Sequence, residues 1–340
     1  MEPLPTQPKT LRPRSDWRRF WFGIVISLIF LWLAMRQVDW RIVWLTAQEV
    51  SPVWLLIGVV TGSLVYGLFA LRWQALLSPA VSVSVPDAFS YIMIGYLANT
   101  ILPLRLGDIV RAVLLGRRHA ISAMAVFGAV TVERLLDVGW VLLIALLLSF
   151  FAPLPEAVRI GAMVFAGGML AGLGALVLLI RVPPARQQLW IQRFPFIPLS
   201  LRQKGATLTA SFVGGLQVLG DMAQLWRAIW ISGLAWVALG LGTMSYVHAF
   251  KLPVPWYAGW AVLVAVNLGA AIPSSPGFIG VYHYLVWLAL SMWMLDKNPA
   301  ISYALLTHGL NIAVIMLLGG VSLWREGWSL RNLVRPEIVQ

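Results

Sequence analysis

Six charged side chains lie in or beside one break in an otherwise apolar part of this chain. The break reads Asn99-Thr-Ile-Leu-Pro103-Leu-Arg-Leu-Gly107-Asp108. The six residues are Arg105, Asp108, Arg111, Glu133, Arg134 and Asp137. The first three recur at intervals of three and lie near one helical face, whereas Glu133 and Asp137, four apart, share a face of another segment with Arg134 beside them. Arginine pairs with carboxylates and phosphates through parallel hydrogen bonds, so these residues suit either internal ion pairs or the binding of an anionic group.

If this part of the chain is embedded in a membrane, the charges must be paired, hydrated or close to the interface. One unpaired charge at the bilayer centre costs roughly 2.5–3.5 kcal/mol on insertion scales. Three positive and three negative groups allow complete pairing, for example of Arg105 or Arg111 with Glu133 or Asp137. Two interpretations stay open. In the first, the ion pairs only hold helices together at the cytoplasmic end of the domain. In the second, the arginines bind an anionic group in a water-filled vestibule, and the carboxylates keep the arginines in place.

A second break in apolar sequence carries almost no charge. It reads Asn267-Leu-Gly-Ala-Ala-Ile-Pro273-Ser274-Ser275-Pro276-Gly277. Ser275 suits the N-cap position and Pro276 the first turn, so we expect a half-helix that runs on to Trp293. Its free N–H groups would attract an anion by roughly 2 kcal/mol when partly buried. The alternative is a plain kink whose N–H groups are satisfied by neighbouring side chains or water.

The two breaks share a spacing. Each contains Pro-x-x-x-Gly, and Pro103 and Pro273 are 170 positions apart in a chain of 340 residues. Paired interruptions in the two halves of a chain indicate a transporter's binding site, because broken helices expose backbone groups at membrane depth. We therefore expect the charged residues and both breaks to form the substrate site. We assign His283 to this expected site as well. It is either an interior histidine whose hydrogen bonds are satisfied or a group that couples transport to protons.

Composition assigns the chain to the integral membrane proteins. Apolar residues make up 60% and charged residues only 11%, well below the roughly 25% of a soluble domain. Because cysteine is absent and the four histidines are scattered, we expect no disulfide, no metal site and no cofactor. The net charge of +12 comes from residues that flank apolar spans, which argues against nucleic acid as a partner.

Apolar runs near or above 20 residues predict the spans. They cover 20–35, 52–77, 120–151, 158–180, 228–250 and 299–324, with broken segments at 88–118 and 256–294. Placing the arginine-rich segments in the cytoplasm orients the spans. The expected organisation is a disordered cytoplasmic tail at 1–19, one transmembrane domain at 20–325 with a cytoplasmic loop at 181–227, and a cytoplasmic tail at 326–340.

This topology makes the two breaks enter the membrane from opposite faces. Each lies between two spans, in units at about 52–151 and 228–324 that point in opposite directions. Inverted repeats of this kind are found in many secondary transporters. We therefore predict an all-α polytopic membrane protein with six to eight transmembrane helices and two broken, re-entrant helical hairpins. For the second hairpin, two full crossings satisfy the same charges.

The chain resembles a known family over roughly residues 20–325. The pattern is Asn99-x-x-x-Pro103-x-Arg105-x-Gly107-Asp108-x-x-Arg111, then Glu133-Arg134-x-x-Asp137, then Pro273-x-x-Pro276-Gly277-x-x-Gly280. It is similar to the lysylphosphatidylglycerol synthase transmembrane region, also called the flippase-like family. The resemblance implies a polytopic membrane domain, with lipid-translocating activity in its best-known fused members.

Two departures from the family pattern bear on the substrate. The family's Gly-Glu is Gly107-Asp108 here, and a Glu often found after the last motif is replaced by His283. If that Glu binds a cationic headgroup, its replacement argues against a lysyl lipid. The chain also ends at Gln340 without the soluble aminoacyl transferase domain, so the resemblance implies transport and not synthesis.

We expect a lipid transporter of the plasma membrane, with both termini in the cytoplasm, that moves an amphiphile with an anionic headgroup between leaflets. Motifs of soluble enzymes are absent, so we expect no enzymatic activity. The alternative is an accessory membrane subunit that transports nothing and docks a lipid-modifying enzyme or glycosyltransferase through Pro183 to Arg227. A homo-oligomer is compatible with either. A membrane-embedded transferase would use the acidic cluster as base, but no metal or nucleotide motif supports it.

Overall fold

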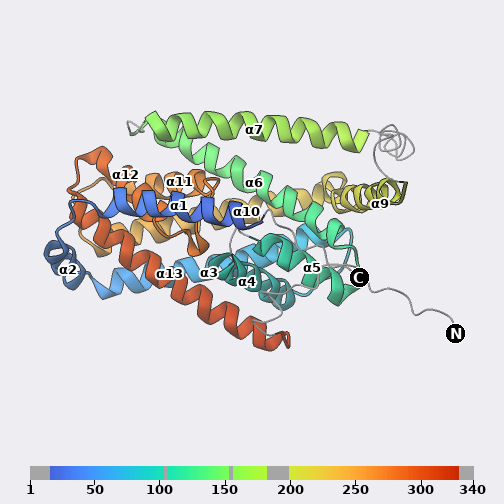
Figure 1. Ribbon diagram of the computed structural model, residues 1–340, viewed down its shortest axis with the longest axis horizontal. Coiled ribbons are helices and arrows are strands. Elements are labelled where there is room, and N and C mark those ends of the chain that lie inside the picture. Colours follow the sequence, from blue (N-terminus) through green and yellow to red (C-terminus); the bar gives the residue numbers. More distant parts are fainter. Residues whose placement is uncertain (1–15, 103–105, 153–155, 182–198, 329–340) are drawn as a thin grey trace.

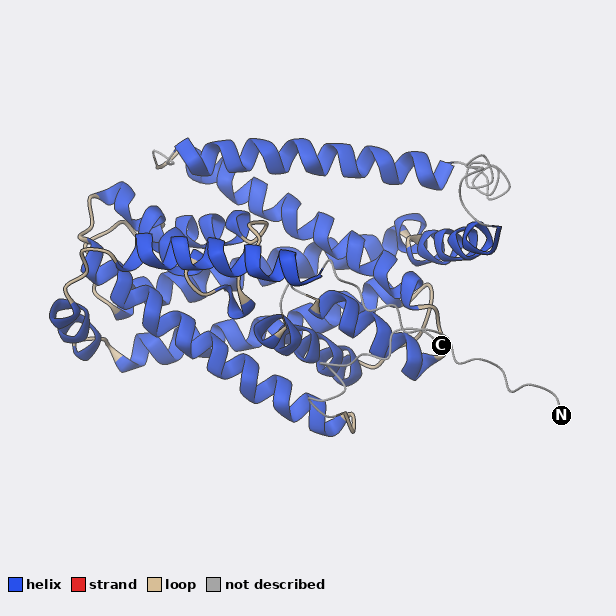
Figure 2. Ribbon diagram, viewed as in Figure 1, coloured by secondary structure: helices blue, strands red, loops and turns tan. Residues whose placement is uncertain are grey.

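The computed structural model describes residues 16–102, 106–152, 156–181 and 199–328 (Figure 1). Within these ranges the chain forms twelve α-helices and no β-strand, so the predicted all-α architecture is confirmed (Figure 2). Pro103 and Arg105 lie outside the described residues, as do 1–15, 182–198 and 329–340.

Helices make up most of the described chain. Their bounds are α1 Asp16–Met35, α2 Trp40–Gln48, α3 Pro52–Leu77, α4 Val85–Ile101, α5 Gly107–His119, α6 Ala123–Ser149, α7 Glu156–Arg181, α9 Leu199–Gly215, α10 Met222–Ala249, α11 Ala258–Gly269, α12 Val281–Leu290 and α13 Lys297–Arg325. Three short 3₁₀ turns accompany them, η2 Gln217–Gly220, η3 Pro276–Phe278 and η4 Ser291–Trp293.

Side-chain caps fix where several helices begin. Ser84 caps α4 and Ser122 caps α6, each by accepting a hydrogen bond from an N–H of the first turn. α10 begins at Met222 because Asp221 accepts the Gln224 N–H at 3.1 Å. This start precedes the predicted span at 228–250, since a cap and not apolarity determines where the helix begins.

Within the part of the chain that the structure describes, three helices, α3, α10 and α13, are long and apolar enough to cross a membrane. They coincide with the predicted spans at 52–77, 228–250 and 299–324. α1 and α2 meet at a bend of 80° and together would count as a fourth. The predicted spans at 120–151 and 158–180 also form helices, α6 and α7, whereas α2 is a helix that the apolar runs did not predict.

Pairs of helices from different parts of the chain pack closely. α3 and α10 run along each other, and Gly58 allows their approach, because a Cβ there would lie 2.4 Å from the Tyr246 ring. α4 packs on α13, and α11 packs on α6. Each broken segment therefore rests on a helix from the other half of the chain. Figure 1 shows α7 along one edge, where it contacts α6 and α11.

Part of the segment 181–227, which we expect to be a cytoplasmic loop, is helical. α9 packs on α6, and two glycines allow the close contact. A Cβ on Gly215 would lie 1.9 Å from the Ala125 carbonyl oxygen, and one on Gly128 would lie 2.6 Å from the Phe212 carbonyl oxygen. The contact ties α9 to the helix that carries Glu133.

The two predicted units follow the same order of long, short, short and long helices. α12 begins at Val281 and α5 at Gly107, while α13 begins at Lys297 and α6 at Ala123. The number of positions between the two starts is the same for both pairs. We term this separation the repeat offset. Neighbours also correspond. α4 packs on α3 and α5, as α11 packs on α10 and α12, and α5 packs on α6 as α12 packs on α13. The repeat offset holds for α5 with α12 and for α6 with α13, whereas the first residues of α3 and α10, and those of α4 and α11, are separated by slightly fewer residues.

The chain between α11 and α12 departs from the predicted half-helix. The predicted helix start at Ser275 is wrong, because only the turn η3 forms there, without a side-chain cap, and α12 begins at Val281. Gly277, Phe278 and Gly280 have φ angles of 70°, 60° and 87°. These angles belong to the left-handed region and interrupt a right-handed helix.

α1 packs against this second break. The Ser275 N–H donates a hydrogen bond of 2.6 Å to Oγ of Ser27, a buried residue of α1. Gly280 lies so close to α1 that a Cβ on it would be 2.3 Å from the Ser27 carbonyl oxygen and 3.0 Å from the Leu31 nitrogen. A helix outside both units therefore satisfies an N–H group that we expected to be free.

We predict that Gly280→Ala destabilises the protein, because alanine disfavours the positive φ of this position and the added Cβ needs space that Ser27 occupies. The expected loss is about 1–3 kcal/mol of unfolding free energy, measured as a lower Tm in detergent. Gly320→Ala in α13 is the matched control, since a Cβ there meets nothing within 4 Å. An unchanged Tm for Gly280→Ala contradicts the contact between α1 and the second break.

Candidate functional site

The two breaks meet at one cavity of about 560 Å³. Asn99 and Thr100 line it from the end of α4, and Ser275, Gly277 and Phe278 line it from the second break. The two segments touch, since a Cβ on Gly277 would lie 3.7 Å from the Thr100 carbonyl oxygen. Side chains of α3, α6, α10 and α13 contribute to the other walls. The breaks therefore contribute to a single site.

Asn99 joins the two sides of the first break. Its side-chain oxygen Oδ1 accepts a hydrogen bond of 2.7 Å from the Gly107 N–H at the start of α5. Gly107 lies against α4, where a Cβ would be 2.0 Å from the Gly95 carbonyl oxygen. These contacts hold the first turn of α5 beside α4, and Asp108 in that turn lines the cavity.

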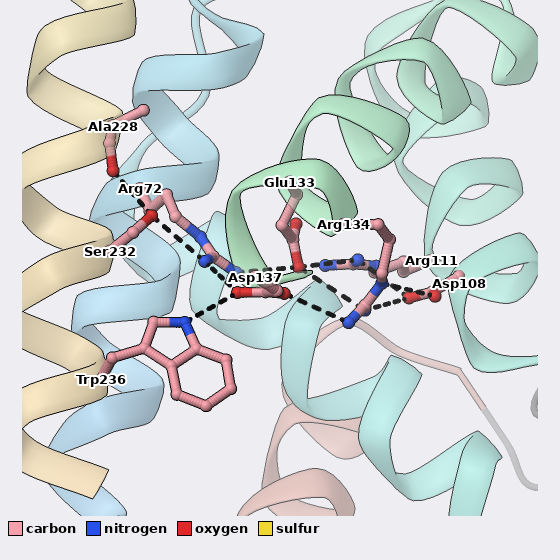
Figure 3. Close-up of polar contacts among 9 residues, drawn as sticks. All are labelled: Arg72, Asp108, Arg111, Glu133, Arg134, Asp137, Ala228, Ser232 and Trp236. Atoms are coloured by element: carbon pink, nitrogen blue, oxygen red, sulfur yellow. Dashed lines mark hydrogen bonds and ion pairs between the residues drawn. The ribbon is translucent and has the colours of Figure 1, made fainter. Parts of the chain in front are cut away.

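Six charged side chains form a network beside the cavity, which we term the ion-pair cluster (Figure 3). They come from α3, α5 and α6 and are Arg72, Asp108, Arg111, Glu133, Arg134 and Asp137. Three positive and three negative groups cancel. This balance is what a low-dielectric interior demands, because an uncompensated buried charge is strongly destabilising.

Glu133 is the centre of the buried part of the cluster. Its Oε1 atom lies 3.1 Å from Nη2 of Arg72 and 3.1 Å from Nη2 of Arg111, and the three side chains are between 1% and 4% exposed. The guanidinium of Arg72 lies 4.7 Å from the ring centroid of Phe69, and that of Arg111 lies 4.9 Å from that of Trp73. Neither arginine lines the cavity.

The cavity face of the cluster consists of Asp108, Arg134 and Asp137. Arg134 donates two hydrogen bonds to Asp108, from Nη2 to Oδ1 at 2.9 Å and from Nε to Oδ2 at 3.1 Å. It donates a third from Nη1 to Oδ2 of Asp137 at 3.3 Å. The Arg134 side chain is 46% exposed, which makes it the arginine of the cluster that a molecule in the cavity can reach.

α10 joins the cluster through Asp137. The Trp236 indole N–H donates to Oδ1 of Asp137 at 3.3 Å, and the same oxygen lies 2.5 Å from Nη1 of Arg72. Nη1 of Arg72 also donates to the Ser232 hydroxyl at 3.3 Å, which donates in turn to the Ala228 carbonyl oxygen at 2.8 Å. The cluster thus connects α3, α5 and α6 with a helix of the second unit.

Comparison with known protein families decides the assignment. Residues 20–319 match the lysylphosphatidylglycerol synthase TM region. The chain belongs to this family. No curated protein matches the chain. Family membership and the long apolar helices make it a multi-pass membrane protein, consistent with a role in lipid metabolism or transport.

The family motifs of the first half come together in the structure. Asn99 and Gly107 close the break, and of the pairings that the sequence left open, that of Arg111 with Glu133 is present. The other predicted charged residues described by the structure, Asp108, Arg134 and Asp137, belong to the same cluster. Arg105 and Pro103 lie outside the described residues, so their place relative to the cluster stays a prediction.

Arg72 is the member of the cluster that the sequence reasoning missed. It is a lone charge within the apolar run 52–77 and has no helical spacing to the other five. The signal that could have found it is its charge, because an ionisable residue inside a span is costly and needs a partner. In the structure Arg72 is the third arginine of the cluster, a position that we assigned to Arg105.

The predicted residues of the second break are divided between the cavity and the interior. Ser275 and Gly277 line the cavity, and Pro276 is the first residue of η3. The Ser274 hydroxyl is buried without a hydrogen-bond partner among the described residues. His283 is 4% exposed, and its Nδ1 atom accepts the Gly280 N–H at 3.3 Å, the geometry of an interior residue that caps α12.

We predict that Arg72→Met destabilises the protein by about 3–5 kcal/mol, because the buried Glu133 and the partly exposed Asp137 each lose a partner. Chemical unfolding in detergent measures the loss. Adding Asp137→Asn should recover part of it, since it removes the negative charge that the two remaining arginines leave uncompensated. Arg159→Met is the control, because Arg159 is 63% exposed and its ion pair with Glu156 spans 3.9 Å. Strictly additive effects of Arg72→Met and Asp137→Asn contradict a direct coupling.

Proposed function

We propose that this protein moves a lipid with an anionic headgroup between the leaflets of the plasma membrane. The observation that carries the proposal is the meeting of two helix breaks at one cavity whose wall holds a half-exposed arginine. Membership in the family supports a lipid as the substrate. The proposal contains no covalent step, so it assigns no residue to catalysis.

The short helices beside each break support a re-entrant arrangement. α4, α5, α11 and α12 have 17, 13, 12 and 10 residues, fewer than the roughly 20 that a helix needs to cross the hydrocarbon. In the proposed topology each pair enters and leaves by one face of the membrane. The repeat offset that α5 with α12 and α6 with α13 share supports an inverted repeat, with the first hairpin entering from the cytoplasm and the second from outside.

Basic residues support a cytoplasmic location for both termini. Arg117 and Arg118 lie in the last turn of α5, and Arg325 lies in the last turn of α13. Arg325 pairs with Asp87 at 2.9 Å, which brings the end of α13 to the start of α4. Positive residues at the ends of spans stay inside, so we orient this end of the molecule toward the cytoplasm.

Arg134 is the proposed contact for the headgroup. A guanidinium has five N–H donors, and the hydrogen bonds to Asp108 and Asp137 use three of them. The two carboxylates fix its orientation and offset its charge. A guanidinium that is held in this way presents its remaining donors to a phosphate oxygen without first losing rotamer freedom.

The alternative function, an accessory subunit, predicts a different result in a transport assay on the purified protein. Its expected docking segment, 183–227, lies partly outside the described residues, and α9 within that segment packs on α6. An accessory subunit predicts no lipid movement by the protein alone. A transport assay therefore separates the two functions.

We predict that Arg134→Gln lowers lipid translocation at least tenfold in reconstituted vesicles. A hydrogen bond to a charged group contributes about 1.5–3 kcal/mol, and 1.4 kcal/mol corresponds to about a factor of ten. The assay follows an acyl-labelled fluorescent phosphatidylglycerol as it changes leaflet, with a membrane-impermeant quencher outside. The Tm of each variant is measured in parallel.

Arg325→Gln is the matched control. Arg325 is 45% exposed and its carboxylate partner lies at 2.9 Å, as for Arg134 and Asp108, but Arg325 does not line the cavity. Its variant should translocate at the native rate. A native translocation rate for Arg134→Gln would contradict the proposed headgroup contact. Absence of transport by the unaltered protein would favour the accessory role.

A further inference from the structure

The cavity has a second group of polar side chains, which we term the neutral cluster. It contains no carboxylate, guanidinium or ammonium group. Its members come from α3, α12 and α13, and all of them line the cavity: Tyr66, Tyr282, Thr307, His308 and Asn311. All members except Tyr66 lie in the second half of the chain, and the positions that correspond to them in the first half are charged.

The neutral cluster corresponds in position to the ion-pair cluster. The repeat offset pairs four charged residues with uncharged hydrogen-bonding ones: Asp108 with Tyr282, Glu133 with Thr307, Arg134 with His308, and Asp137 with Asn311. It also pairs Gly95 with Gly269 and Arg111 with Leu285. Packing supports this correspondence, because a Cβ on Gly95 would lie 3.2 Å from Arg111 and a Cβ on Gly269 would lie 2.1 Å from Leu285.

Hydrogen bonds within the neutral cluster leave both donors and acceptors for a ligand. The Thr307 hydroxyl donates to the Tyr303 carbonyl oxygen at 2.8 Å, so in the 3.2 Å contact between Tyr282 and Thr307 the Tyr282 hydroxyl donates. The Tyr282 oxygen keeps its acceptor capacity. Tyr66 donates to Oδ1 of Asn311 at 3.1 Å, and no described residue takes the two N–H donors of that amide.

Aromatic rings hold these groups in place and add flat apolar faces. Tyr282 stacks on His308 with 4.3 Å between ring centroids. Tyr66 meets Tyr96 edge to face at 5.3 Å, and Tyr96 stacks with Phe69 at 6.4 Å. All five rings line the cavity. Amphipathic rings of this kind contact the C–H face of a ligand while hydroxyl and amide groups bind its polar atoms.

We propose that the neutral cluster binds the hydroxyl groups of a polyol headgroup, such as glycerol, inositol or a sugar attached to the lipid phosphate. The inference rests on the proposed function, in which Arg134 binds the phosphate. A hydroxyl donates and accepts at once, which matches the tyrosine oxygen and the asparagine amide. The two described carboxylates of the cavity wall, Asp108 and Asp137, are already paired with arginines, so they offer no unpaired carboxylate to an ammonium headgroup.

Lipids of equal charge test the proposal on the unaltered protein. Phosphatidylglycerol and phosphatidylinositol carry headgroup hydroxyls, whereas phosphatidylpropanol is also a phosphodiester but carries none. In reconstituted vesicles at least one hydroxylated lipid should move about two- to tenfold faster than phosphatidylpropanol, the effect of one neutral hydrogen bond. Equal rates for all three lipids overturn the polyol site and leave lipid transport standing. Movement of none of them overturns the proposed function as well.

Two variants locate the preference within the cavity. Tyr282→Phe and Asn311→Leu should each lower the rate of the hydroxylated lipid toward that of phosphatidylpropanol. The readout is the ratio of the two lipid rates in the same vesicles, and the Tm of each variant is measured in parallel to show that it is folded. Tyr284→Phe is the matched control on α12, because Tyr284 packs against Phe30 and Trp287 and does not line the cavity. A headgroup preference that survives both cavity variants overturns the assignment to this cluster.

Discussion

The pairing of Glu133 with two buried arginines is the interaction on which the rest of the structure depends. Arg72, Arg111 and Glu133 come from three different helices, so none of α3, α5 and α6 can move away without leaving a charge in an apolar interior. The same network reaches the cavity through Arg134 and reaches α10 through Asp137. The position of the cavity wall therefore follows from the way in which these charges are compensated.

The two units share their spacing and differ in their chemistry. Corresponding positions carry carboxylates and arginines in the first unit, and hydroxyl, amide and imidazole groups in the second. α1 adds a further difference, because it lies outside the two units and packs on the second break. There Ser27 of α1 accepts a hydrogen bond from the Ser275 N–H. In the proposed mechanism this asymmetry lets one side of the cavity bind a phosphate and the other bind hydroxyl groups.

Much of the fold and part of the site follow from the sequence, because apolar length and buried charge are strong constraints. Long apolar runs predicted α3, α10 and α13, and the cost of unpaired charge predicted ion pairs among the charged residues, of which Arg111 with Glu133 is one. The start of α12 was not predictable from Ser275, since a cap signal is local and the positive φ of Gly280 accompanies its packing on α1. Arg72 was missed because its partners lie far along the chain, on α6, and form no periodic pattern with it.

The central claim is that a lipid headgroup enters the cavity beside Arg134. Photocrosslinking tests it most directly, with an anionic lipid that carries the reactive group on its headgroup and with the labelled peptides identified by mass spectrometry in reconstituted vesicles. The account predicts labels on the walls of the cavity, in α6 near Arg134 and Asp137 and in α13 near Asn311. Labels confined to exposed outer surfaces, such as Met163 and Val164 of α7, would contradict it.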